Sequence, residues 1–231
     1  MKIAIIPARG GSKRIAKKNI KNFFNKPIIS YSINAAVESG LYDEIMVSTD
    51  SEEIALIARN YGAKVPFIRS KKNSSDYSST VDVLIEVLDY YKKKDVNFDI
   101  ATCLYPCSPL INLDNLSNSI KIIEKELVDC VFPIVKYSHP IERSLTLSKK
   151  NIISPVSSVT NFLRTQDFNN YFHDAGMFYT FDVETLYLKK TLRTNNTYGM
   201  IISELQSQDI DNESDWKLAE LKYKLFINEK L

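Results

Sequence analysis

The N-terminal stretch joins an apolar strand to a loop that suits phosphate groups. Residues Ile3 to Ile6 form a continuous apolar run, typical of a strand covered on both faces, and Pro7 ends its hydrogen-bonding ladder. Gly10 and Gly11 then allow the backbone to approach a ligand closely, so that successive N–H groups can converge on an anion. In open α/β sheets ligands bind at the carboxyl ends of strands, where this loop lies. The stretch therefore predicts an α/β fold with a phosphate site.

The loop is also rich in cations, supplied by Arg9, Lys13, Arg14, Lys17 and Lys18. Arg binds phosphate through a two-pronged fork and Lys acts as a point charge, so the mixture suits a triphosphate whose charge moves during a reaction. The pattern is neither a Walker A loop nor G-x-G-x-x-G. A plain basic surface loop is the alternative, but Gly-Gly-Ser between Arg and Lys at a strand end favours the phosphate site.

The charge balance favours a small anionic substrate over nucleic acid. The formal net charge is only +2, and the excess cations are concentrated near the N-terminus. Three cysteines without a C-x-x-C pair indicate a reducing compartment. No segment approaches the roughly twenty apolar residues of a membrane span, and the N-terminal apolar run is too short for a signal peptide. We therefore expect a cytoplasmic protein with no membrane or nucleic-acid partner.

Hydrophobic periodicity predicts alternating helices and strands over most of the chain. Helices are expected from Pro27 to Gly40, from Asp50 (as N-cap) to Gly62, over about fourteen residues after Thr80, from about Leu113 to Lys125, and from Asn212 to Phe226 with Leu218, Leu221 and Leu225 on its apolar face. Strands are expected at Glu44–Ser48, Lys64–Ile68, Phe98–Leu104, Asp129–Val135, Met177–Thr180 and Met200–Leu205. Ser144 to Ser154 predicts a two-stranded excursion, followed by a polar stretch without a period. This order predicts one Rossmann-like α/β domain over 1–231 with a small irregular subdomain.

Asp209 and Asp211 form a second candidate site. Carboxylates at i and i+2 in an extended segment point to the same side, so both can reach one or two hard divalent cations. The alternative is that Asp211 caps the last helix, and the two roles are compatible. Together with a triphosphate loop, the pair favours metal-assisted phosphoryl-type chemistry.

The stretch Ile-Ile-Pro-Ala-Arg-Gly-Gly-Ser-Lys-Arg-Ile-x-x-Lys-Asn resembles the signature of the cytidylyltransferases that activate nonulosonic acids. These enzymes make the CMP derivatives of sialic, legionaminic and pseudaminic acids. The resemblance extends over nearly the whole chain and implies a mainly parallel twisted sheet flanked by helices, of the nucleotide-diphospho-sugar transferase type. It also implies CTP as substrate, one or two Mg²⁺ ions on Asp209 and Asp211, and a homodimer formed through a protruding arm at about 137–171.

The resemblance assigns CTP contacts to the first loop and to two later strand ends. The expected nucleotide-binding residues are Arg9, Gly10, Gly11, Ser12, Lys13, Asn19, Arg69 and Tyr105, with Ser79 and Thr80 as weaker candidates. Of these, Arg9 and Lys13 are expected to act in catalysis with Asp211. Tyr105 stands where the family has a Gln that helps to select cytosine. A Tyr can stack, donate through its hydroxyl or merely cap the strand end, and backbone groups can read the base instead.

The acidic sugar is assigned to residues around the arm. Arg164-x-Gln166 and the segment His173-Asp174-Ala-Gly176 resemble family positions that contact the sugar, and the latter variant is most similar to the pseudaminic acid branch. A surface or core histidine is the alternative for His173. Lys136, His139 and Arg143 can also reach a carboxylate, although a polar connector explains them better.

The implied reaction is transfer of CMP from CTP to the anomeric hydroxyl of a nonulosonic acid, with pseudaminic acid expected first and legionaminic or sialic acid as alternatives. Two other classes remain open. A metal-dependent glycosyltransferase also uses Asp-x-Asp on a related sheet, but carries that motif near the middle of its chain. A non-catalytic nucleotide-binding regulator needs the loop but not the second carboxylate.

Overall fold

The computed structural model describes residues 1–228 except 13, 157–163, 165 and 167. A central sheet has the strand order β11-β6-β10-β5-β1-β4, with β9 paired to β6. Its strands are β1 (Lys2–Pro7), β4 (Glu44–Ser48), β5 (Ile100–Leu104), β6 (Cys130–Lys136), β9 (Phe172–Asp174), β10 (Phe178–Asp182) and β11 (Thr197–Ile201). Strands β4, β1, β5, β6 and β11 share one direction, and β10 and β9 run against them. The expected mainly parallel α/β sheet is confirmed.

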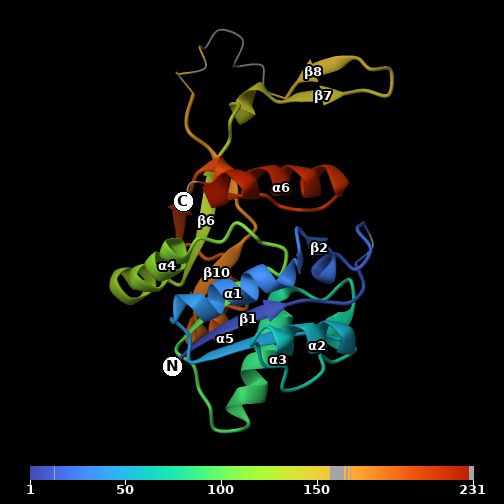
Figure 1. Ribbon diagram of the computed structural model, residues 1–231. Coiled ribbons are helices and arrows are strands. Elements are labelled where there is room, and N and C mark those ends of the chain that lie inside the picture. Colours follow the sequence, from blue (N-terminus) through green and yellow to red (C-terminus); the bar gives the residue numbers. More distant parts are fainter. Residues whose placement is uncertain (13, 157–163, 165, 167, 229–231) are drawn as a thin grey trace.

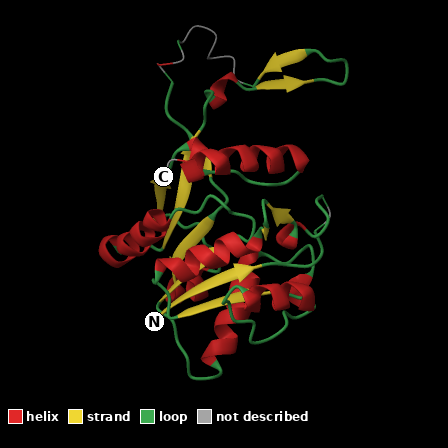
Figure 2. Ribbon diagram, in the orientation of Figure 1, coloured by secondary structure: helices red, strands yellow, loops and turns green. Residues whose placement is uncertain are grey.

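Helices cover both faces of this sheet (Figures 1 and 2). They are α1 (Ile29–Ser39), α2 (Glu52–Asn60), α3 (Thr80–Lys92), α4 (Leu113–Glu126), α5 (Val183–Lys189) and α6 (Glu213–Asn228). The side chains of β1 alternate between two cores: Ala4 and Ile6 pack with α1, α2 and α4, whereas Ile3 and Ile5 pack with α3 and α5. All four side chains are fully buried, so β1 is a strand covered on both faces, as its apolar run predicts.

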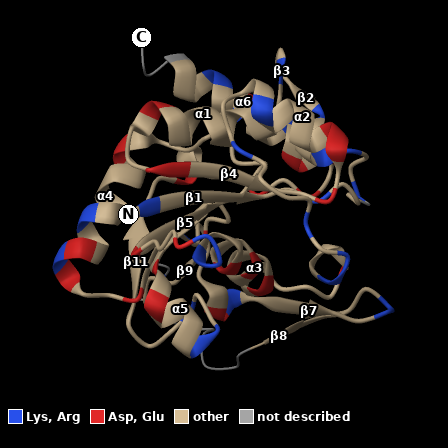
Figure 3. Cartoon of the chain, turned by 90° about the horizontal axis from the view of Figure 1, so that it is seen from below, with Lys and Arg blue, Asp and Glu red and all other residues tan. Residues whose placement is uncertain are grey.

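Short elements complete the fold. A small β2–β3 hairpin (Asn22–Phe23 and Lys26–Pro27) follows the first loop, and 3₁₀ turns occur at Lys18–Ile20, Lys72–Ser74, Ile141–Arg143 and Glu204–Gln206. The predicted excursion forms the antiparallel pair β7 (Leu145–Leu147) and β8 (Ile153–Pro155). This hairpin projects from the body beyond α6 (Figure 1). Lys and Arg alternate with Asp and Glu over the outer helices α2, α4 and α5 (Figure 3).

Several sequence expectations were wrong in detail. Lys64–Ile68 forms only an isolated bridge from Lys64 to Met46 and not a strand, although it does lie beside the sheet's edge strand β4. Ser51, not Asp50, caps α2 by accepting from the Ile54 N–H. Strand β9 and helix α5 were not expected, because each is short and gives no periodic signal.

The apolar face of α6 is also not the expected one. Leu218, Leu221 and Leu225 are between 44% and 59% exposed, whereas Trp216 and Ala219 are buried. The Phe23 ring packs edge-on against Trp216 at a centroid distance of 5.6 Å. Helix α6 therefore rests on the first loop and the β2–β3 hairpin through an aromatic cluster.

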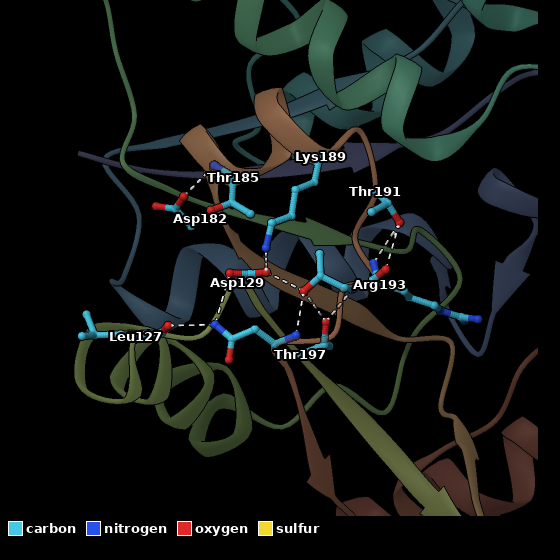
Figure 4. Close-up of polar contacts among 10 residues, drawn as sticks. Leu127, Asp129, Asp182, Thr185, Lys189, Thr191, Arg193 and Thr197 are labelled. Atoms are coloured by element: carbon cyan, nitrogen blue, oxygen red, sulfur yellow. Dashed lines mark hydrogen bonds and ion pairs between the residues drawn. The ribbon is translucent and has the colours of Figure 1, made fainter.

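The loop between α5 and β11 is tied to the start of β6 by the carboxylate of Asp129 (Figure 4). Its Oδ2 accepts from Lys189 Nζ at 2.5 Å and from Thr194 Oγ1 at 2.5 Å, and its Oδ1 accepts from Asn196 Nδ2 at 3.2 Å. The Asp129 side chain is only 12% exposed. The hydrogen bond from Lys189 is the main cause that lowers the pKa of this carboxyl below its usual value.

We expect Asp129→Asn to lower the free energy of unfolding by about 1–3 kcal/mol at pH 7, because it removes the charge that three donors share. The folded-state pKa lies below the unfolded one, so this stabilisation is complete above the unfolded pKa, near 4, and is lost as the pH falls through the folded pKa. Urea unfolding at pH 7 and pH 3 measures it. The control is Asp99→Asn, since Asp99 is 84% exposed in its ion pair. Equal losses in both variants would contradict the role of Asp129.

Candidate active site

A cavity of about 570 Å³ opens at the carboxyl ends of β1 and β5. The sequence predicted this place, because the first loop leaves the sheet there. Predicted residues in its wall are Arg9, Ser12, Asn19, Arg69, Tyr105 and Asp209, joined by Ser79 and Thr80. The structure thus brings residues from five separate stretches of the chain to one cavity.

Contacts to neighbouring loops hold the glycine-containing loop in place. The Gly10 N–H donates to Asp50 Oδ1 at 2.8 Å, which is the role that Asp50 has instead of capping α2. A Cβ at Gly10 would lie 3.2 Å from the Ser51 Cβ, so the close approach of the two loops favours glycine here. Asn19 is 6% exposed and donates from Nδ2 to the Arg9 carbonyl at 2.9 Å. Asn19 therefore fixes the backbone that carries Arg9.

Both arginines of the loop have carboxylate partners near the cavity. Arg9 Nη1 lies 2.5 Å from Oδ1 of Asp76, a residue of the polar segment before α3, and both side chains are about two-fifths exposed. Arg14 Nη2 lies 2.7 Å from Asp211 Oδ1. Such half-exposed ion pairs are weak and can be exchanged for a more highly charged ligand. Lys13, the other predicted catalytic cation, lies outside the described residues.

Arg69 is a buried cation in the cavity wall, with 6% of its surface exposed. Its Nε donates to Ser48 Oγ at 2.9 Å, and its Nη2 donates to the Ser48 carbonyl. Burial is the main cause that lowers the pKa of Arg69, while the charges of Asp50 and Glu86 act in the opposite direction. A guanidinium held by neutral oxygens keeps its charge available to an anionic or carbonyl-bearing ligand.

Tyr105 places its ring in the cavity wall and packs against Tyr179 of β10. The two rings meet edge to face with centroids 5.7 Å apart. The Tyr105 backbone is fixed as well, because its N–H donates to the Met177 carbonyl and its carbonyl accepts from Ser32. Burial raises the pKa of its phenol, so the neutral hydroxyl is present at neutral pH.

The Asp-Ile-Asp segment lies with Ile210 inward. Ile210 is 1% exposed and packs in a cluster with Ile15, Phe23 and Trp216. Because alternate side chains of an extended segment point to opposite sides, Asp209 and Asp211 face away from this cluster. Burial, followed by the charge of Asp211, raises the pKa of Asp209.

Helix α6 is not capped by Asp211. The Oδ1 of Asn212 accepts from the Ser214 and Asp215 N–H groups at 2.8 and 3.0 Å. The Asp215 carboxylate in turn accepts from the N–H groups of Asp211 and Asn212. This reciprocal arrangement is a capping box, so the capping alternative for Asp211 was wrong. Among the described residues, the Asp211 side chain forms ion pairs with Arg14 and Lys18.

The two carboxylates fit a magnesium ion that arrives with a nucleotide. Mg²⁺ is usually held by one or two carboxylates together with phosphate oxygens and water. Within the described part of the chain, no three His, Cys, Asp or Glu side chains come together as a potential metal-binding group. The donor set of Asp209 and Asp211 therefore matches an ion shared with substrate phosphates better than a metal held by protein ligands alone.

The residues predicted for the sugar lie apart from this cavity's lining. Arg164 and Gln166 are exposed in the arm, with residues 165 and 167 outside the described part. His173 and Asp174 belong to β9, beside β6. The Nδ1 of His173 lies 2.9 Å from the Asp174 carbonyl, an acceptor, so Nδ1 carries the proton, and the ring packs on Tyr137.

Sequence reasoning assigned no role to several residues that the structure brings to the site. Asp76, Tyr179 and Arg193 are the main ones. Asp76 gave a weak signal as the only acid of a polar Ser/Asn-rich segment. Tyr179 and Arg193 gave none, because their relation to the site depends on how β10 and the loop after α5 pair with the rest of the sheet.

The mixed sheet, the cationic loop at its carboxyl edge and the paired carboxylates together define a nucleotidyltransferase-like site. Residues 3–225 match the family model described as cytidylyltransferase, and the chain belongs to this family. The resemblance inferred from the first loop is confirmed. Among the described residues, no helix is long and apolar enough to cross a membrane.

Two related enzymes resemble the chain over nearly its full length. It is 36% identical to the pseudaminic acid cytidylyltransferase of Campylobacter jejuni over 225 residues, covering 96% of each chain. It is 31% identical to the CMP-N,N'-diacetyllegionaminic acid synthase of Legionella pneumophila, covering 94% of each. The solved structure of a CMP:2-keto-3-deoxy-manno-octonic acid synthetase complexed with CTP has the same fold, with a TM-score of 0.70, 17% identity and coverage of 100% of this chain and 99% of that one.

Proposed function

We propose that this protein transfers CMP from CTP to the anomeric hydroxyl of a nonulosonic acid, and that the sugar is pseudaminic acid. The observation that carries the proposal is the single cavity in which Arg9, Arg69 and Asp209 converge at the end of the parallel strands. Similarity to the pseudaminic acid enzyme of Campylobacter jejuni supports the choice of sugar. Legionaminic acid is the second candidate, because the Legionella enzyme is also similar over most of its length.

In the proposed reaction the sugar's anomeric oxygen attacks the α-phosphorus of CTP and pyrophosphate leaves. Arg9 and Lys13 neutralise the charge that develops on the pyrophosphate, and the Gly10–Gly11 backbone and Ser12 hold its oxygens. Arg9 becomes available by exchanging its ion pair with Asp76 for the phosphates. Arg69 and Tyr105 line the part of the cavity near α3, which we assign to the nucleoside.

Asp209 and Asp211 are proposed to hold Mg²⁺ together with the phosphates. When bound, the ion polarises the α-phosphate and lowers the pKa of the attacking hydroxyl. Asp211 must leave Arg14 to take this role, and Arg14 is then free to meet a phosphate oxygen. Both changes are driven by the arrival of the same polyanion.

We further propose that the chain works as a cytoplasmic homodimer. Its three cysteines are free thiols, which suits a reducing compartment. The β7–β8 hairpin of the arm at 137–171 carries exposed apolar side chains, namely Leu145, Leu147, Ile152 and Ile153. A projecting apolar hairpin of this kind is suited to packing on a second copy of the chain. Arg164 and Gln166 in the same arm, together with His173, are proposed sugar contacts.

We expect pyrophosphate release from CTP to require both Mg²⁺ and a nonulosonic acid, with pseudaminic acid turned over faster than legionaminic or sialic acid. CTP should be used far better than UTP or ATP. A coupled pyrophosphate assay with this panel of sugars and nucleotides measures both preferences. Equal turnover of UTP would show that base selection is lost with Tyr105, and CTP binding without any pyrophosphate release would favour a regulator. A metal-dependent glycosyltransferase would instead release a nucleotide from a nucleotide sugar.

A further inference from the structure

Arg193, in the loop between α5 and β11, is a cation that the proposed reaction has not used. Its Nη2 donates to Asp174 Oδ2 at 2.5 Å, and its guanidinium carbon lies 5.8 Å from the centre of the Phe132 ring. The Tyr179 hydroxyl donates to the same carboxylate oxygen, and the Gly176 N–H donates to Oδ1 at 2.8 Å. Both oxygens of Asp174 therefore accept hydrogen bonds from this chain, and the carboxylate serves to place Arg193.

This cluster borders the candidate active site. Gly176 lines the cavity, and Tyr179 packs edge-on against the cavity residue Tyr105. The sheet order β10-β5-β1 sets Tyr179 of β10 beside Tyr105, which directly follows β5, whereas Arg9 follows β1 on the other side of β5. Arg193 thus adjoins the side of the cavity opposite to the phosphate loop.

The loop that carries Arg193 is anchored at its base. The Arg193 N–H donates to Thr191 Oγ1 at 3.1 Å, and the Thr194 hydroxyl donates to the mostly buried carboxylate of Asp129. Figure 4 shows the Arg193 side chain extending away from this network. A side chain on a fixed loop, held by a carboxylate acceptor, loses less entropy when it binds a ligand than a free arginine does.

Stability alone does not account for this arrangement. The Arg193 side chain is 66% exposed, while Asp174 is 20% exposed. An ion pair to so exposed a cation contributes little to folding, typically about 0–1 kcal/mol. A guanidinium has five N–H donors in a rigid fork, and the exposed part of this one can receive a planar anion from solvent.

We propose that Arg193 binds the carboxylate of the acidic sugar, with Asp174 and Tyr179 as the residues that position it. This inference rests on the proposed function, because it requires an anionic acceptor. Arg9, Arg14 and Lys18 line the β1 side of the cavity, where the proposed reaction places the triphosphate. A second anion that enters on the β10 side needs a cation of its own, and Arg matches a carboxylate bidentately. The carboxylate contact then lies in the loop between α5 and β11, whereas the family resemblance assigns sugar contacts to Arg164 and Gln166 in the arm.

The test measures KM for both substrates in Arg193→Met and Arg193→Lys. We expect Arg193→Met to raise the KM for the sugar acid at least tenfold while the KM for CTP stays within twofold. Wild type should prefer the acid over its C1 carboxamide, and Arg193→Met should lose most of that preference. Arg193→Lys keeps the charge but not the fork, so it should recover part of the affinity.

Lys64→Met is the matched control, because the Lys64 side chain is 69% exposed and lies 2.7 Å from the mostly buried carboxylate of Glu44, but it does not line the cavity. It should leave both KM values unchanged. An unchanged KM for the acid in Arg193→Met, a parallel rise for CTP, or the same effect in Lys64→Met would overturn the proposal. Loss of acid preference in Arg164→Met but not in Arg193→Met would assign the carboxylate to the arm. Failure of wild type to use any nonulosonic acid would refute the proposed function itself, before Arg193 is tested.

Discussion

Asp209→Asn is expected to lower kcat/KM at least a hundredfold while leaving the fold intact. Asn has nearly the shape of Asp, but it lacks the charge that holds a divalent cation at the reacting phosphate. Loss of such a ligand removes several kcal/mol of transition-state stabilisation. The folded state should not suffer, since Asp209 is exposed and a neutral amide removes its repulsion from the charge of Asp211.

The measurement is kcat/KM across a Mg²⁺ titration, together with the thermal midpoint. Asp211→Asn belongs in the same series and should also lose activity. Asn212→Ala is the matched control, because Asn212 is the true cap of α6 and its loss should cost about 0.5–2 kcal/mol of stability with little change in kcat/KM. An Asp209→Asn enzyme with wild-type activity at low Mg²⁺ would rule out the metal role.

Those parts of the site that depend on local chemistry could be predicted from the sequence. The run Ile3–Ile6 and the loop after it predict a buried strand and an anion site within a few residues of each other; the strand is confirmed, and the loop lines a cavity. The alternation in Asp209-Ile210-Asp211 is also a local signal. Ile210 packs into an apolar cluster, so the two carboxylates lie on the opposite side of the segment.

Helix α6 shows where the sequence is insufficient. Leu218, Leu221 and Leu225 have the spacing i, i+3 and i+7, but so do Trp216, Ala219 and Tyr223. Periodicity therefore predicts two apolar stripes and cannot choose between them. The choice is made by Phe23, whose ring contacts both Trp216 and Tyr223, and this contact is remote in sequence.

The same limit applies to Arg193 and Asp174. Their ion pair depends on β9 pairing antiparallel with β6 and on the loop after α5 folding back over Asp129. Neither event has a local signal, because β9 spans only Phe172–Asp174. Conversely, Asp50 looked like a helix cap by local rules, yet its carboxylate accepts from the loop backbone at Gly10 instead. Local rules therefore do not determine the hydrogen-bond partner of such a polar side chain, because a tertiary contact can replace the helix cap.

Arg69→Met is expected to raise the KM for CTP about 10- to 100-fold without loss of stability. Removing a charge-assisted contact to a ligand costs roughly 1.5–3 kcal/mol, which corresponds to that range. The side chain is 6% exposed and donates to the hydroxyl and the carbonyl of Ser48. Methionine fills a similar volume and relieves the cost of burying that charge, so the free energy of unfolding should stay equal or rise.

A purely structural Arg69 predicts the reverse pattern. The variant would then lose stability, because the Ser48 hydroxyl and carbonyl would lack their donors, and the KM for CTP would not change. Arg59→Met separates the two cases from any general effect of losing an arginine. Arg59 also donates to a backbone carbonyl, that of Val65 at 3.2 Å, but it does not line the cavity. Urea unfolding and CTP titration of both variants distinguish the two roles. If Arg69 serves to bind the nucleotide, its removal weakens CTP binding and leaves the free energy of unfolding unchanged or higher.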